Sequence, residues 1–594
     1  MNNAVAGLSW AEAVAAAPPR DPLTPIERTN IITMFTSLLD GLYVNRPPKR
    51  AMDSIDPLQQ LCRMYERAET MSDETFHREI GAIVTSVSDI QTAYIAPSWL
   101  AGTTARLPFL VEQLGADDEP RFIVTKIIRE LVDDPDFVPG VELVEWNGVP
   151  IADAVRCRGE SERGMRPDSA MARALDSLTF RPLGIGPPPD EQWIVVGYRD
   201  RDDAPVREHR FDWRFIYPGP PPDAAHPTSL AAAANAIHPD RALVRRAKKL
   251  SFDSRLCQSE RQNPVAGHFY DTACARVVAV DGRDYGYLRL WSFEVGDDDA
   301  FVAEVVRLLA ELPQRGLIVD LRGNPGGLIW AAERLLQLFT PSPIAPIPFS
   351  IVASNLTRAM TDAPQNRGSL GPWRPTSLDT VDTGEDCPPS APITPAARCN
   401  DIGQVYGGPV IAVIDSTTYS AADLFVAGLV DNGIGNVVSV GMAADAGFAN
   451  AWSADMVSSV LAGTLEQLPH LPKGVGFTMS VRRAAHVSAT HVGHVPYVMT
   501  RNDLLNGNED LLTFCARLIE STPASSLTAH WKAPNLEVAV AELDRIDVCV
   551  DGRPPQSHDI TDALQLTIRH PRHHIRIEGY EGAILQQVRT IRLT

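Results

Sequence analysis

The feature that most constrains the fold is a regular alternation of apolar strands and amphipathic helices that begins near residue 284. Strands are expected at 285–290, 317–321 and 410–414, and helices at 300–312, 329–339 and 421–430. Nearly continuous apolar strands that alternate with helices are typical of a largely parallel sheet buried between helical layers. The sequence therefore predicts a layered α/β core, which we place at residues 276–526.

The rest of the chain is expected to form smaller units around this core. The length of 594 residues indicates three to five domains. Helical periodicity predicts an N-terminal helical region (1–103), and short strands predict a separate unit (104–218) that ends in the proline-rich segment Pro218–Pro222. A helical linker (219–275) and a C-terminal β domain (527–594) complete the expected multidomain α/β organisation.

Charge and composition exclude several classes of function. The net charge of −20 argues against a general nucleic-acid or anionic-membrane binder, and no apolar run approaches the ~20 residues of a membrane span. The N-terminus lacks the basic and apolar regions of a signal peptide. The eight cysteines form no CxxC pair, so reduced thiols in a cytoplasmic protein are expected, although Cys387 and Cys399 share a loop and could pair if oxidised. We expect no metal and no cofactor.

Ser420 is the residue whose surroundings are most suggestive of chemistry. The apolar strand 410–414 runs through a short polar turn into helical sequence, which places Ser420 at a helix N-terminus. Backbone N–H groups and the helix dipole favour negative charge at such a position, as a nucleophilic serine requires. Ser420 and Asp423 also fit a capping box, in which the serine would only satisfy free backbone donors. The local pattern allows both interpretations.

Three segments together resemble the tail-specific (C-terminal-processing) serine peptidase family. They are the sequence Asp-Leu-Arg-Gly-Asn-Pro-Gly-Gly at 320–327, the elbow Thr-Tyr-Ser-Ala-Ala-Asp at 418–423, and the segment 140–150, which is similar to the PDZ-like peptide-binding module of these enzymes. The likeness extends from about residue 70 to the C-terminus. It is closest to the bacterial branch that carries a PDZ-like module and ends in a small β domain. The resemblance implies a crotonase-like core of the ClpP and tail-protease type.

The resemblance also assigns roles to individual residues. Ser420 matches the family nucleophile, and its own N–H or that of Ala421, with a glycine N–H at Gly326 or Gly327, would form the oxyanion hole. The PDZ-like module binds an extended peptide as an added strand, often at its terminal carboxylate. The residues expected to contact that peptide are Gly140, Val141, Trp146 and Asn147.

The general base is where the sequence departs from the family. One branch uses a lysine about 25 residues after the serine in a Gly-Lys-Gly setting, but residues 441–448 here contain no lysine. The other branch uses the histidine of an Asp-x-His-Thr segment, and the matching residues Asp89–Thr92 carry Gln91 at that place. The acidic residue of that branch aligns with Thr490 and His491. An amide can hydrogen-bond a hydroxyl but cannot accept its proton at neutral pH.

Three other residues are candidates for a displaced base: His491, His494 and Lys473. We therefore interpret the chain as a peptide-binding protein on a serine peptidase fold whose proteolysis is weakened or lost, a pseudoenzyme with a role in peptide maturation. The alternatives are an active serine endopeptidase with a non-standard base, and an assembly protein whose PDZ-like unit mediates self-association. The expected partner is a peptide or unstructured polypeptide, without nucleic acid or membrane, and homo-oligomerisation is left open.

Overall fold

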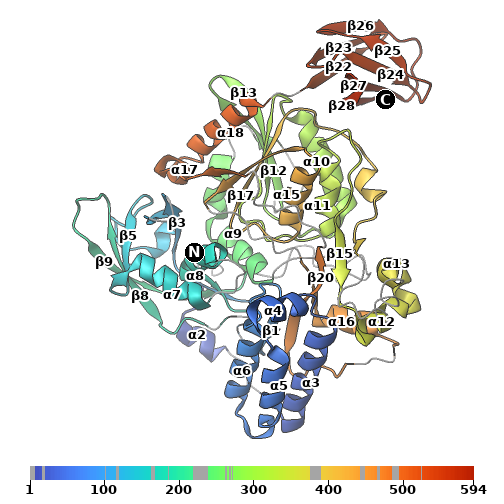
Figure 1. Ribbon diagram of the computed structural model, residues 1–594. Helices are drawn as coiled ribbons and strands as arrows, with labels where there is room; N and C mark the ends of the chain where they lie inside the picture. Colours follow the sequence, from blue (N-terminus) through green and yellow to red (C-terminus); the bar gives the residue numbers. More distant parts are fainter. Residues whose placement is uncertain are drawn as a thin grey trace.

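The computed structural model shows a layered α/β core with three appended parts (Figure 1). It describes residues 7–16, 21–98, 100, 102–115, 119–161, 167–184, 186, 188–218, 239–260, 264–265, 269, 272–374, 390–441, 449–464, 468–484, 494–522 and 525–593. In Figure 1 the C-terminal strands lie at the top, the N-terminal helices at the bottom, and the strands of residues 104–216 at the left. Within the described residues, no helix combines the length and the apolar character that a membrane span requires.

A seven-stranded sheet forms the centre of the core. Its strand order is β11 (Pro264–Val265), β12 (Ala273–Val280), β13 (Arg283–Leu290), β14 (Leu317–Asp320), β17 (Val410–Asp415), β18 (Gly435–Val440) and β21 (Val495–Tyr497). From β13 to β21 all neighbours are parallel, as the apolar alternation predicts. On one face the sheet packs against α10 (Asp298–Glu311), α11 (Ile329–Leu336) and α15 (Ala421–Asp431), and on the other against α18 (Glu509–Ser521).

A second sheet joins the N-terminal helices to the core. It contains β1 (Ala93–Ile95), β20 (Gly476–Ala484), β15 (Pro348–Ile351) and β16 (Ala391–Pro392), with β19 (Ala449–Ser453) also paired to β20. The helices α3 (Pro25–Gly41), α4 (Arg46–Asp53), α5 (Pro57–Tyr65) and α6 (Asp73–Thr85) precede β1, and α16 (Ala454–Leu461) follows β19. Phe35 on α3 packs on Tyr94 and Phe477, so β1 is held between the helices and β20.

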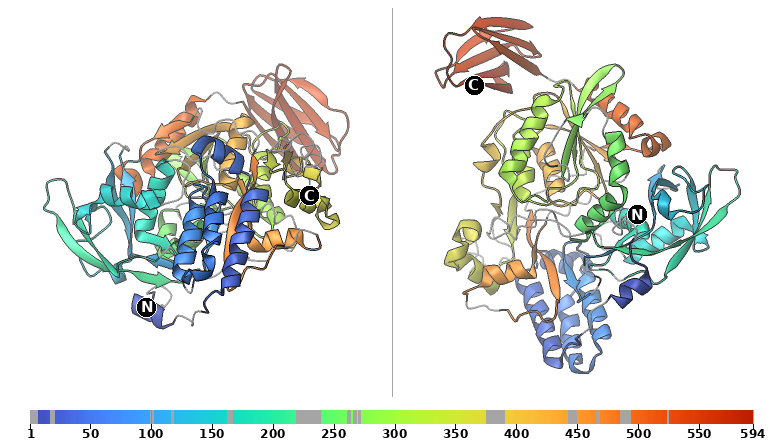
Figure 2. Two further views of the ribbon diagram at one scale, coloured as in Figure 1. Left: turned by 60° about the horizontal axis from the view of Figure 1, so that its bottom comes forward. Right: turned by 180° about the vertical axis from the view of Figure 1, so that it is seen from behind.

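The unit of residues 104–218 has two sheets of its own. The larger has the order β3 (Phe109–Leu114), β4 (Arg121–Ile127), β5 (Glu142–Trp146), β8 (Trp193–Arg199) and β9 (Arg207–Asp212), with β6 (Val149–Pro150) on β5. The smaller joins β10 (Arg214–Ile216), β2 (Thr104–Arg106) and β7 (Phe180–Pro182). Helices α7 (Ile151–Ser161) and α8 (Pro167–Thr179) lie beside the larger sheet, and α9 (Pro239–Glu260) leads back to the core (Figure 2).

The C-terminal part is a pair of antiparallel sheets. One contains β22 (Ser526–Lys532), β23 (Asn535–Ala541) and β26 (Ala563–Thr567), and the other β25 (Gln556–Asp559), β24 (Arg545–Val550), β27 (His574–Glu581) and β28 (Ile584–Arg592). Their facing apolar side chains form a separate small core. Arg589 and Gln587 bond to Val405 and Gly407, which fixes this part to the α/β core.

The structure confirms the multidomain α/β class and corrects two local expectations. Proline-rich sequence predicts a loop at 360–405. This segment instead contains the end of α12 (Asn355–Asp362), the short helix α13 (Arg367–Leu370) and three 3₁₀ turns, at Pro364–Asn366, Gly371–Trp373 and Arg398–Asn400. The basic cluster on α9, which comprises Arg245, Arg246, Lys248 and Lys249, is predicted from its helical sequence to be a solvated face. Instead Arg245 and Arg246 pair with Glu294, and Lys248 pairs with Asp176, so the cluster joins α9 to its neighbours.

Candidate active site

Ser420 occupies a sharp turn between β17 and α15. Its backbone has φ 59° and ψ −119°, a region that non-glycine residues enter only at a cost of about 1–3 kcal/mol and that is enriched at functional sites. Its side chain makes no capping hydrogen bond to α15, so the capping interpretation is wrong for this residue. The hydroxyl instead points to a partner from a distant part of the chain.

That partner is Gln91, in the turn that precedes β1. Its Nε2 donates a hydrogen bond of 3.1 Å to the Ser420 Oγ, and both side chains are buried. Asp89 holds the turn, because its carboxylate accepts from the Gln91 N–H and from the Thr92 hydroxyl. The Oε1 of Gln91 is buried and has no hydrogen-bond partner among the described residues. The residue aligned with the family histidine therefore lies against the serine hydroxyl.

The loop after β14 brings two glycines to the same site. Gly326 and Gly327 have φ of 88° and 145°, and a Cβ on Gly327 would lie only 2.0 Å from the carbonyl carbon of Phe293. Asn324 fixes the loop: its Oδ1 accepts from the Gly326 N–H, and its backbone carbonyl accepts from the Tyr419 N–H. The N–H groups of Gly327 and Ala421 donate to no residue that the structure describes.

Two carboxylates brace this end of the sheet. Asp320 is 1% exposed and contacts Tyr287, Arg289 and Arg322. Burial alone would raise the pKa of Asp320, but the two guanidinium groups hold it well below its usual range. Asp415 accepts from the backbone N–H groups of Gly323 and Thr417, so the ends of β14 and β17 are joined.

Of the three candidate bases, the structure describes Lys473 and His494 but not His491. Lys473 donates to the Pro22 carbonyl and pairs with Asp21 and Glu27, at the start of α3. Despite some desolvation, the hydrogen bonds to these carboxylates raise the pKa of Lys473, the opposite of what a proton acceptor needs. His491 and Thr490 lie outside the described residues, as do residues 442–448. His494 lies just before β21, and the Ser420 hydroxyl is hydrogen-bonded to Gln91 and not to His494.

A contact between units that the sequence did not indicate reaches the elbow. Arg173 on α8 donates a 2.6 Å hydrogen bond to the Tyr419 hydroxyl, and the Arg241 guanidinium lies 5.8 Å from the centre of the Tyr419 ring. Asp176 on α8 in turn pairs with Arg241 and Lys248 of α9. The residue next to Ser420 is thus held by two helices outside the α/β core. No motif marks Arg173 in the sequence, because the contact spans 246 residues.

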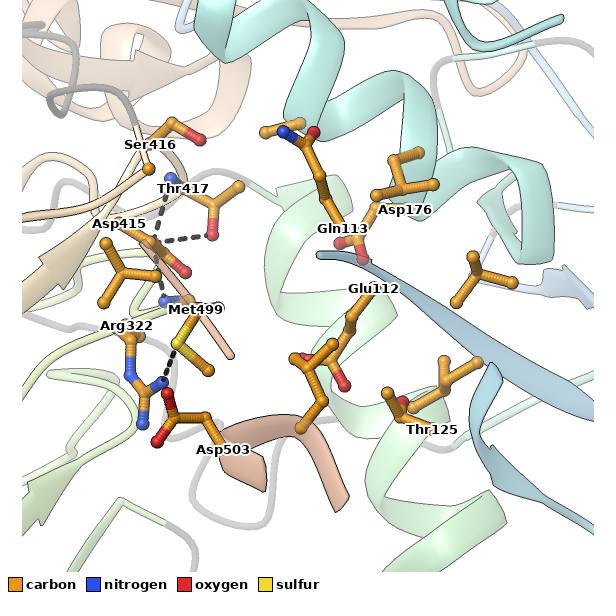
Figure 3. A pocket seen from close by; sticks show the side chains of 18 of the residues that line it. Glu112, Gln113, Thr125, Asp176, Arg322, Asp415, Ser416, Thr417, Met499 and Asp503 are labelled. Atoms are coloured by element: carbon orange, nitrogen blue, oxygen red, sulfur yellow. Dashed lines mark hydrogen bonds between the residues drawn. The ribbon is translucent and has the colours of Figure 1, made fainter. Parts of the chain in front are cut away.

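A cavity of about 1380 Å³ lies between the unit 104–218 and the core. Figure 3 shows its two walls: Glu112, Gln113 and Asp176 face Asp415–Thr417, Arg322 and Met499. The edge strand β3 and the helix α8 line one side, and the loop that leads into the elbow lines the other. Ser420 is 2% exposed and does not itself line this cavity.

The four expected peptide contacts lie on β5 or directly beside its two ends. Gly140 donates to Val124 and accepts from Arg501, and Trp146 is 6% exposed between β6 and β8. Val141 is buried and accepts from Val124, and Asn147 exchanges hydrogen bonds with Val195. Asn147 and Gly148 form the hairpin turn between β5 and β6, with φ of 50° and 79°. The backbone groups that a peptide strand would need at these residues are therefore already used.

One acidic group in the described part of the chain has the spacing of a metal site, Asp297, Asp298 and Asp299. Its charge is already compensated, because Arg334 and Arg398 both pair with Asp298 and Asp299. Asp297 accepts from the Ala300 N–H as the cap of α10. These contacts explain the cluster as the anchored start of a helix.

Comparison with known proteins agrees with this architecture. Residues 284–452 match the family model described as peptidase family S41. The crystal structure of mature CPAF superposes with a TM-score of 0.58 at 16% identity, over 84% of this chain and 99% of that one, and mature CPAF complexed with lactacystin gives 0.56 with the same identity and coverage. The photosystem II D1 C-terminal processing protease shares 12% identity over 79% of this chain and 92% of its own, with a TM-score of 0.32. None of the curated proteins compared with the sequence matches it.

The matched region contains the parallel strands β13, β14, β17 and β18, the two glycines and the Ser420 elbow. The family match and the fold agree on the same residues, so residues 284–452 of this chain form a domain of peptidase family S41.

Proposed function

We propose that this protein binds unstructured polypeptide on a serine peptidase fold whose proteolytic activity is weakened or lost. The observation that carries the proposal is the 3.1 Å hydrogen bond from Gln91 to Ser420. A serine hydroxyl becomes a useful nucleophile only when a base removes its proton, and an amide is no base at neutral pH. Turning the amide over would exchange donor for acceptor and would still supply no base.

The binding half of the proposal rests on the cavity between β3 and α8. The strand β3 is at the edge of its sheet, and among the described residues no strand pairs with its outer side. An exposed edge beside a helix is the arrangement in which peptide-binding modules add a ligand strand. Leu110, Met171 and Leu175 give the cavity an apolar wall for alternate side chains of such a strand. We therefore place the bound peptide on β3 and its continuation toward the Asp415–Thr417 loop.

Proton transfer and binding can be tested separately. The protein is incubated with an unstructured polypeptide such as reduced, alkylated casein, and fragments are followed by mass spectrometry for the parent chain and for Ser420→Ala. We expect the two proteins to give the same background, because oxyanion stabilisation without a base yields only about 10³–10⁴ over the uncatalysed rate. Cleavage that disappears in Ser420→Ala would contradict the loss of activity and favour an active endopeptidase with another base.

Binding is measured by calorimetry with the same polypeptide. Met171→Arg places a charge in the apolar wall of the cavity, and we expect it to weaken affinity at least about tenfold, since a desolvated charge costs more than 1.4 kcal/mol. The matched control is Val206→Arg, an exposed position of the same unit that does not line the cavity. Absence of heat with every polypeptide, together with a concentration-dependent oligomer, would instead favour an assembly protein.

A further inference from the structure

Arg482 on β20 is a buried cation with no counterion among the described residues. It is 2% exposed, and its side chain makes no hydrogen bond or ion pair with any of them. An unpaired charge in a protein interior is strongly destabilising, which is why buried arginines normally bind a carboxylate or a set of carbonyl groups. A partner that compensates the buried charge of Arg482 is therefore expected.

Two tryptophans hold the guanidinium in place. Its carbon lies 4.5 Å from the ring centre of Trp373 and 5.1 Å from that of Trp452. Both rings are themselves fixed, because Trp373 donates to the Phe349 carbonyl and Trp452 to the Asn450 side chain. Stacking on aromatic faces compensates part of the buried charge, but it gives Nε and Nη2 no hydrogen-bond partner.

The unsatisfied atoms are Nε and Nη2, which form one edge of the guanidinium fork. Two parallel N–H groups at this edge match the two oxygens of a carboxylate and bind it bidentately. The register of β19 against β20 shifts between Asn450 and Ala451, so β20 has an extra residue, Val481, just before Arg482. Bulges of this kind redirect side chains and are common beside functional sites.

Arg482 lies on the strand that supports the Gln91 turn. The Ser480 N–H donates 3.1 Å to the Thr92 hydroxyl, and Thr92 follows Gln91, the partner of Ser420. Two strand residues cover about 7 Å, so Arg482 lies about that far along β20 from the residue that supports the Gln91 turn.

We propose that Arg482, clamped between Trp373 and Trp452, is a carboxylate-binding site. The carboxylate is either that of a free small acid or that of a polypeptide held at the site, from its C-terminus or an acidic side chain. The second source rests on the proposed function, whereas the first does not. In the absence of a carboxylate, burial lowers the pKa of Arg482 to about 9, and a bound anion would restore the preference for the charged form.

The first experiment measures thermal unfolding with increasing sodium acetate at constant ionic strength, set with sodium perchlorate. Because a ligand of the folded state raises its stability with concentration, the midpoint should rise with acetate. Arg482→Met removes the fork, and Arg482→Lys keeps a charge but not the two parallel N–H groups. We expect both to lose the acetate response, with at least about a tenfold weaker apparent affinity.

The matched control is Arg483→Met, the neighbouring and less buried arginine, which should respond to acetate as the parent does. A parent protein whose midpoint ignores acetate overturns the proposal, and this outcome needs no variant to fold. An equal acetate response in parent and Arg482→Met overturns it as well.

The second experiment identifies the source of the carboxylate. A peptide that binds the parent is compared in its free-acid and C-terminally amidated forms, by calorimetry with parent and Arg482→Met. If the parent prefers the free-acid peptide and Arg482→Met shows no preference, the site binds the peptide C-terminus. If an internal aspartate restores the binding of the amidated peptide to the parent, the site binds an acidic side chain. Equal binding of all forms, with the acetate response intact, assigns the site to a free small acid. Loss of peptide binding alone would contradict the proposed function and not the acetate site.

Discussion

The two sides of the candidate site contrast sharply, although one hydrogen bond joins them. On the side of the α/β core, Ser420 has a strained backbone and Gly327 a position that only glycine can occupy. On the side of β1, an ordinary turn presents Gln91 at the place where a peptidase needs a base. In our proposal the core side supplies the N–H groups for an oxyanion, while the β1 side presents the Gln91 amide in place of a base. Oxyanion stabilisation and proton transfer would then depend on separate parts of the fold, so that one could be lost without the other.

The largest effect on the difference between the two sides is expected from Gln91→His, which adds a base to the β1 side. A general base typically contributes about 10²–10⁴ in rate, so we expect Ser420-dependent cleavage of casein to rise by at least 10²-fold over the parent. The new activity should increase with pH through the ordinary histidine pKa of about 6.5, because only the neutral imidazole accepts a proton. Gln91→Asn serves as control and should stay inert. A silent Gln91→His would show that more than the base is missing.

Gly327→Ala tests the core side. The new Cβ would lie 2.0–2.3 Å from the backbone of Phe293 and Glu294, at a φ of 145°. We expect a loss of about 3 kcal/mol or more in the free energy of unfolding, measured by urea denaturation. Gly368→Ala, which meets nothing within 4 Å, is the matched control and should change stability by no more than about 1 kcal/mol. Equal stabilities would mean that this loop relaxes easily and is no rigid oxyanion donor.

Glu333, on the helix that follows Gly327, makes the free energy of unfolding depend on pH. Burial raises the pKa of Glu333 from 4.5 to about 7, although hydrogen bonds from Thr394 and Ile347 oppose the shift. The folded state therefore binds more protons than the unfolded state between these values, so this group's stabilisation is complete below pH 4.5 and is lost as pH rises to 7.

The difference in unfolding free energy between the parent and Glu333→Gln should change by about 2–3 kcal/mol between pH 4.5 and 8, with the parent losing more. Denaturation at several pH values measures it, and Glu119→Gln, on an exposed turn, provides the comparison. Parallel pH curves for parent and Glu333→Gln would contradict this assignment.

The smallest effect is expected at the contact between the units. Tyr419→Phe removes the hydroxyl that accepts from Arg173 and leaves the packing in place. We expect a loss of about 1–2 kcal/mol in unfolding free energy, since a buried donor loses its acceptor. Tyr65→Phe, at a half-exposed position, should be neutral. No difference between the two variants would show that α8 does not restrain the elbow.

Much of the fold could be predicted from the sequence because the periodicity of the core is strong. The strands at 285–290, 317–321 and 410–414 and the helices between them were located to within two or three residues. The motif residues Gly326, Gly327 and Ser420 were also identifiable, because unusual backbone conformations select glycines and leave a pattern at fixed spacing.

The remainder depends on contacts between distant segments. Arg173 and Tyr419 are 246 residues apart in the sequence, and Arg482, Trp373 and Trp452 belong to three separate elements. No local sequence pattern could therefore predict these contacts. The basic cluster of α9 was interpreted as solvated for the same reason, since its acidic partners are far away in sequence. Gly140 and Asn147 were expected to contact a peptide, but their backbone N–H groups already donate to β4 and β8.

The most direct measurement of the central claim compares the parent and Ser420→Ala side by side, with casein cleavage by mass spectrometry and casein binding by calorimetry. Our account predicts that both proteins bind the polypeptide with the same affinity and that neither yields fragments above the background. Fragments that the parent produces and Ser420→Ala does not would contradict it.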